Sequence, residues 1–89
     1  MKTREEIFNE VTNRYCENSE FYIFVHIVSN IEFVLWIYPF DAIMKGCVLN
    51  CLTNEETGKR KVARTGDFED DLYYLIDSLI EDAKEAQML

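Results

Sequence analysis

The 89-residue chain is poor in histidine, proline and glycine. It has one histidine, His26, one proline, Pro39, and three glycines that lie far apart. Phosphate-binding loops need glycine-rich turns before a helix, so nucleotide binding has no support. His26 lies within an apolar run, and none of the cysteines lies in a nucleophile-type turn. We therefore expect no catalytic dyad and no enzyme.

The three cysteines, Cys16, Cys47 and Cys51, contain no CxxC pair. Zinc sites normally use such closely spaced ligands, so we expect no metal and no other cofactor. In a strand, Cys47 and Cys51 would lie about 13 Å apart on one face, too far for a disulfide. The simplest interpretation is free, buried thiols in a reducing compartment. Because no apolar run follows the first basic residues, we expect no signal peptide and a cytoplasmic protein.

Basic residues are scarce, with nine Lys and Arg against 17 Asp and Glu and a net charge of −8. Contacts to phosphate need clustered Lys and Arg, so direct binding of nucleic acid or of an anionic membrane is disfavoured. A basic protein surface is the plausible partner. A membrane span over Phe21–Phe40 is also disfavoured, because Asn30 and Glu32 would lie near the bilayer centre.

Aromatic and β-branched residues are abundant over Phe21–Phe40. This composition predicts two strands, 21–28 and 31–38, joined by a turn at 29–30 and ended by Pro39. With a two-residue turn, the predicted pairs are Val28 with Ile31, His26 with Phe33, and Phe24 with Leu35. Both faces of this hairpin are apolar, and one small domain has to cover them.

The flanking segments predict helices. A capping box at Thr3 and Glu6 begins a helix over about 4–17. The last helix begins near Asp67, where acidic residues fill the first turn. Its apolar residues recur at helical spacing and form a core stripe: Phe68, Leu72, Leu75, Ile76, Leu79 and Ala83.

Two further strands are predicted between the hairpin and the last helix. The third covers 47–52, after Gly46, and is followed by a hairpin loop over 54–58 with Gly58 in the left-handed conformation. The fourth covers 59–65, and its charged side chains mark a sheet edge: Lys59, Arg60, Lys61 and Arg64. The predicted fold class is α+β, a single domain over residues 1–89 in which a four-stranded antiparallel meander lies between two helices.

This order of elements resembles the double-stranded-RNA-binding domain. In that family, lysines at the start of the last helix grip phosphates. Acidic residues occupy the matching positions here: Asp67, Glu69, Asp70 and Asp71. The resemblance is therefore one of topology and does not extend to RNA binding.

The leading functional hypothesis rests on an acidic ribbon opposite the core stripe of the last helix, formed by Asp70, Tyr74, Asp77, Glu81 and Glu85. Its carboxylates recur about 6–10 Å apart, of the same order as phosphates along a nucleic-acid backbone. In size and charge the chain is similar to small phage or mobile-element inhibitors, including anti-CRISPR proteins. We predict a non-enzymatic nucleic-acid mimic that binds the basic surface of a nucleic-acid-binding protein. The alternative interpretation is a solvated helix face.

The second hypothesis is a homodimer. If both helices cover one face of the sheet, the other face exposes either Trp36 and Tyr38 or Phe24 and Phe33. If the helices cover opposite faces, no such patch remains. The third hypothesis, a small enzyme or ligand pocket, would have to be centred on His26.

Overall fold

The capping box predicted at Thr3 forms and begins the first helix in the computed structural model, which describes residues 1–88. Thr3 Oγ1 accepts a hydrogen bond from the backbone N–H of Glu6, and the Glu6 carboxylate accepts one from the backbone N–H of Thr3. Helix α1 spans Arg4–Asn18 and ends at Ser19, which adopts the left-handed conformation. The prediction for α1 is confirmed. The domain predicted over 1–89 is described up to residue 88, and Leu89 lies outside the described residues.

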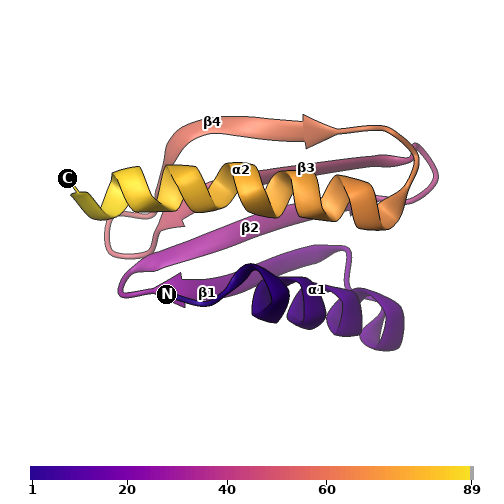
Figure 1. Cartoon of the computed structure of the whole chain (residues 1–89), viewed down its shortest axis with the longest axis horizontal. Helices are drawn as coiled ribbons and strands as arrows, with labels where there is room; N and C mark the ends of the chain where they lie inside the picture. Colours follow the sequence, from indigo (N-terminus) through magenta and orange to yellow (C-terminus); the bar gives the residue numbers. More distant parts are fainter. Residues whose placement is uncertain (89) are drawn as a thin grey trace.

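Four antiparallel strands follow, and their order in the sheet is their order in the chain. They are β1, Tyr22–Val28; β2, Ile31–Tyr38; β3, Ile43–Asn50; and β4, Glu55–Ala63. Helix α2, Phe68–Met88, completes the predicted helix–meander–helix order, which is confirmed. Figure 1 shows both helices in front of the twisted sheet, with α1 along β1 and α2 along β3 and β4.

The pairing predicted for the first hairpin is correct only next to the turn. Val28 pairs with Ile31 as expected, but His26 pairs with Glu32 rather than with Phe33. A bulge at Ile27 causes this shift, because one extra residue enters β1 between two successive pairs. Phe24 consequently lies opposite Val34 instead of Leu35, and the two faces of β2 are the reverse of those predicted relative to β1.

The start of β3 was also predicted wrongly, since the strand begins at Ile43 and contains Gly46 instead of following it. A Cβ atom at Gly46 would lie 2.9 Å from Leu35 Cδ2 and 2.9 Å from Leu79 Cδ1. This glycine therefore serves close packing of α2 on the sheet, and not a turn before the strand.

The strand β4 begins at Glu55, four residues earlier than predicted. The reversal lies at 51–54 and ends at Asn54, whose φ is 59°. Gly58 does have positive φ, as predicted, but it lies inside β4, where the pairing with β3 is shifted. The predicted position of β4 at a sheet edge is confirmed.

One hydrophobic core lies between the sheet and the two helices. Helix α1 contributes the buried Ile7 and Val11, and α2 contributes the stripe expected from its spacing. The β1 side chains in this core are Ile23, Val25 and Ile27. Both helices thus cover the same face, and the opposite face of the sheet has no covering layer in the described part of the chain. Neither of the two helices described is both long and apolar enough to cross a membrane.

Hydrogen bonds from neighbouring residues satisfy two backbone carbonyls on the outer edge of β1. The backbone N–H of Lys2 donates to the carbonyl of Ile27 at 3.2 Å, and the Arg14 guanidinium donates to the carbonyl of Phe24. Arg14 is itself held by Glu20 at 2.9 Å, which keeps the pKa of the Glu20 carboxyl below its usual range. The sheet therefore has one edge at β1 with two occupied carbonyl groups and one charged edge at β4, and both features disfavour pairing with a further strand.

Candidate interaction surfaces

The acidic ribbon predicted from the sequence forms the outer face of α2. Its five members, Asp70, Tyr74, Asp77, Glu81 and Glu85, are all exposed. They lie on the opposite side of the helix from its wholly buried residues, such as Leu72, Leu75 and Leu79. The sequence spacing therefore identified correctly which side of α2 meets solvent.

Two of the ribbon carboxylates are paired with basic side chains. Arg4 donates to both oxygens of Asp77, at 2.7 and 3.3 Å, and this hydrogen bonding raises the pKa of Arg4. Lys84 lies 3.7 Å from Glu81. Asp70 and Glu85 have no ion-pair partner among residues 1–88. The two ends of the ribbon consequently carry the charge that is most available to a partner.

Other acidic residues of α2 have structural roles instead. Asp67 Oδ1 accepts from the backbone N–H of Asp70 at 2.9 Å and caps the helix. Asp71 is only 4% exposed, and its Oδ1 accepts from the N–H and hydroxyl of Thr65 at 3.2 and 2.6 Å. Asp71 thus ties the β4–α2 loop to the helix, a role that sequence spacing did not reveal.

The second candidate surface is the uncovered face of the sheet. Strand pairing and side-chain contacts place these residues on it: Tyr22, Phe24, His26, Glu32, Val34, Trp36, Tyr38, Lys45, Cys47, Glu56 and Arg60. The aromatic rings are in mutual contact, since Tyr22 lies 5.6 Å from Trp36 and 4.8 Å from Phe24 between ring centroids. This face is therefore a preformed aromatic surface with charged residues around it.

Two basic side chains lie over these rings. The guanidinium carbon of Arg60 is 4.5 Å from the centre of the Trp36 ring, and Lys45 Nζ is 5.5 Å from that of Tyr38. Glu56 accepts from Arg60 at 2.8 Å, and the hydrogen bond lowers the pKa of Glu56. The positions of Arg60 and Lys45 over the aromatics were not predicted, because they depend on strand pairing.

The cysteines are free but only partly buried, which corrects the expectation of three buried thiols. Cys47 is buried, whereas Cys16 and Cys51 are exposed, and Cys51 lies in the turn after β3 and not in the strand. Burial, together with Glu56 nearby, raises the pKa of Cys47 to about 12. His26 Nε2 lies 2.9 Å from the Ser29 carbonyl. No group of three metal-ligating residues forms among residues 1–88.

An apolar groove of about 420 Å³ lies at one end of the molecule, beside the β2–β3 turn. Most of its walls are aromatic, and the lining residues are Phe21, Tyr22, Trp36, Tyr38 and Phe40, with Ile37, Pro39 and Asp41. Phe40 follows Pro39 in the turn and is fully exposed. Neither Phe21 nor Phe40 was among the predicted site residues, although the position of Phe40 directly after a strand-ending proline indicates an exposed aromatic residue in a turn.

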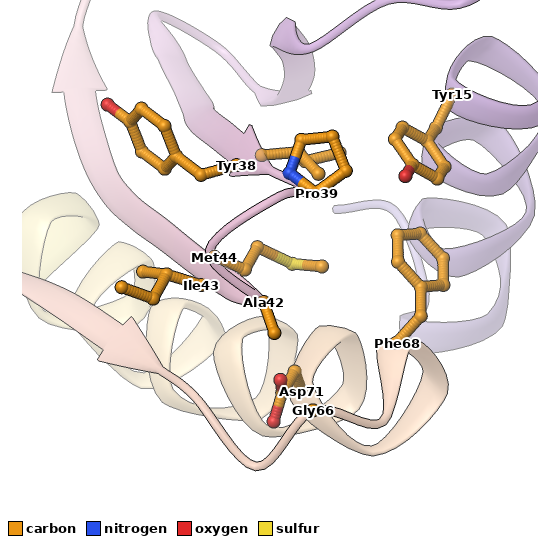
Figure 2. A pocket seen from close by; sticks show the side chains of 10 residues that line it. Tyr15, Tyr38, Pro39, Ala42, Ile43, Met44, Gly66, Phe68 and Asp71 are labelled. Atoms are coloured by element: carbon orange, nitrogen blue, oxygen red, sulfur yellow. The ribbon is translucent and has the colours of Figure 1, made fainter.

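A smaller pocket, of about 210 Å³, lies on the helix side of the same turn. Figure 2 shows Tyr15 of α1 and Phe68 of α2 along one side and Pro39, Ala42 and Met44 across from them. Tyr15 and Phe68 stack at 4.8 Å, so this side of the pocket is held by packing between the two helices. Its carboxylate, Asp71, already binds Thr65.

The aromatic residues on the uncovered face match neither of the two pairs that were predicted for a dimer face. Phe24, Trp36 and Tyr38 share the uncovered face, because the bulge at Ile27 brings Phe24 to the side of Trp36. Phe33 is wholly buried in the core, so its predicted exposure is wrong. The structure thus supports a patch that combines members of both predicted pairs.

Comparison with known proteins gives no relative for this arrangement: no protein-family model, no curated protein and no solved structure matches the chain. The acidic face of α2 and the uncovered face of the sheet are therefore the features of this protein that bear on its function.

Proposed function

We propose that this protein is a non-enzymatic interaction module that places the acidic outer face of α2 on a basic surface of a partner protein. The single observation that carries the proposal is the segregation of charge. Residues 67–89 contain eight acidic residues and one basic residue, whereas the other 66 positions contain nine acidic and eight basic residues. Seven of the eight net negative charges thus belong to one helix and its cap.

The spacing along α2 favours a partner whose natural ligand is a nucleic acid. At 1.5 Å of rise per residue, Asp70 and Asp77 are about 10 Å apart along the axis, and Glu81 and Glu85 follow at steps of about 6 Å. Such a row of carboxylates, in which Asp77 and Glu81 exchange Arg4 and Lys84 for cations of the partner, can occupy a groove lined with Lys and Arg that normally receives phosphates. The proposal includes the class of phage or mobile-element inhibitors that act as nucleic-acid mimics, anti-CRISPR proteins among them.

The available charge at Asp70 and Glu85 would steer association with such a partner. Complementary charges raise association rates and select partners, while aromatic side chains contribute affinity. Tyr74, between them on the same face and 54% exposed, is an aromatic side chain in position for that second role. The free cysteines support the further proposal that the protein works in the reducing cytoplasm.

The test compares two charge-reversed variants as bait in affinity capture from cell extract. One carries Asp70→Lys and Glu85→Lys on the ribbon, and the other carries Glu17→Lys and Glu55→Lys, two exposed acids on other elements. Both variants change the net charge equally. We expect a partner that is captured by the wild type and by the second variant, is lost with the first, and is displaced by added DNA or RNA. Equal retention by both variants, or no displacement by nucleic acid, contradicts the proposal.

A further inference from the structure

We propose that the uncovered face of the sheet binds a second copy of the chain, giving a symmetric dimer with the aromatic groove and Phe40 at its centre. This goes beyond the docking of α2, which lies on the other side of the sheet. It concerns a separate surface, so either proposal can fail without the other.

The size of the exposed aromatic surface matches one side of a stable interface. Five rings at or beside the uncovered face are 37–103% exposed: Phe21, Tyr22, Phe24, Tyr38 and Phe40. At about 150–250 Å² for each aromatic side chain, they present on the order of 550 Å². A standard interface buries about 800 Å² on each partner. The rings alone therefore supply most of that area, and the residues between and around them supply the remainder.

The charge of this face suits a copy of the same chain. Two chains with a net charge of −8 repel each other over most of their surfaces, and most strongly at α2. The uncovered face instead carries Lys45 and Arg60 together with Glu32, Glu56 and, at the groove, Asp41, so its net charge is close to zero. It is the part of the molecule where two copies can approach without a strong net repulsion.

The shape of the face is self-complementary. Phe40 is fully exposed and is itself one wall of the groove of about 420 Å³, which it lines together with Phe21, Tyr22, Trp36 and Tyr38. In a twofold dimer the same patch meets itself, so Phe40 of each copy can enter the groove of the other. An aromatic anchor in an apolar pocket is the arrangement that concentrates binding energy at interfaces.

Two further features favour face-to-face contact. Lys2 and Arg14 occupy two backbone carbonyls on the edge of β1, and the edge of β4 carries charged side chains, so both edges disfavour strand pairing with another chain. Three of the rings are also ordered before contact, because Tyr22 contacts both Phe24 and Trp36, and Trp36 lies under Arg60. A preorganised surface loses less side-chain entropy on binding.

The test is sedimentation velocity of the full chain over a concentration series, with Phe40→Ser and a matched Leu52→Ser control. Leu52 is also a highly exposed apolar side chain in a turn, but it lies in the β3–β4 turn at the other end of β3. We expect the wild type and Leu52→Ser to reach twice the chain mass of 10.5 kDa. Phe40→Ser should raise the dissociation constant at least about tenfold.

Trp36 is the only tryptophan and reports on the face directly. Its emission should shift to shorter wavelength, with reduced quenching by iodide, over the same concentrations at which the dimer forms. A wild type that remains monomeric up to millimolar concentration overturns the inference and leaves the face to a different protein. A dimer that is unaffected by Phe40→Ser, or that forms without a change at Trp36, also overturns it, because its interface then lies elsewhere.

Discussion

The two faces of the sheet are both rich in apolar residues, yet they differ in the kind of apolar residue. On β1 the helix-covered face carries Ile23, Val25 and Ile27, all buried. The uncovered face carries Tyr22, Phe24 and His26, all exposed. Aliphatic side chains have no polar atom to keep in contact with water, whereas tyrosine and histidine do. Along this strand, aliphatic side chains face the core and ring-bearing side chains, two of them with a polar atom, face solvent.

The two faces should differ most in how much unfolding free energy is lost when a phenylalanine is truncated to alanine. Phe33→Ala removes a wholly buried ring and should cost about 3–5 kcal/mol of unfolding free energy. Phe24→Ala removes a ring that is 37% exposed and should cost about 1 kcal/mol. Urea unfolding followed by circular dichroism, at concentrations too low for self-association, measures both. Equal losses would mean that the two faces are buried alike.

A smaller effect is expected where α2 approaches β3. Gly46→Ala places a methyl group 2.9 Å from the ends of Leu35 and Leu79 and should cost about 1–3 kcal/mol. The neighbouring Lys45→Ala changes the uncovered face and should cost less. Thermal unfolding of both variants tests the contrast. Adding Leu79→Val should recover part of the Gly46→Ala loss, since the two positions share one contact; a purely additive double variant would argue against this packing.

Substitution of Arg60 should have the smallest effect on the free energy of unfolding, but a clear effect on the reactivity of the Cys47 thiol. Cys47 is buried, and its pKa of about 12 leaves little thiolate at neutral pH, so it should react with a thiol reagent far more slowly than Cys16 or Cys51. Because burial raises this pKa, labelling should continue to accelerate above pH 9. Arg60→Ala removes a nearby positive charge that lowers this pKa, so labelling of Cys47 at a fixed pH should become slower still, with little change in the urea midpoint, while Lys59→Ala should leave the labelling rate unchanged. Three thiols of equal reactivity would show that the uncovered face shields nothing.

The sequence was sufficient for the fold class and for the exposed side of α2. Local rules act within a few residues there: the capping box at Thr3, the proline after Tyr38 and the helical spacing from Phe68 to Ala83. The same spacing that buries Leu72 and Leu79 exposes Asp70 and Glu81. Helical periodicity can be recognised within one segment of sequence, without knowledge of what that segment packs against.

Tertiary structure decided the composition of the second surface. A single extra residue at Ile27 sent Phe33 into the core and placed Phe24 beside Trp36, and side-chain alternation alone contains no signal for such a bulge. Position 46 of β3 is a glycine because Leu79, 33 positions later, occupies the space that a Cβ atom would take. The choice of covering one face with both helices likewise depends on contacts between distant segments. Chain-local patterns therefore determined which elements form, while packing between them determined which aromatic residues remain in contact with solvent.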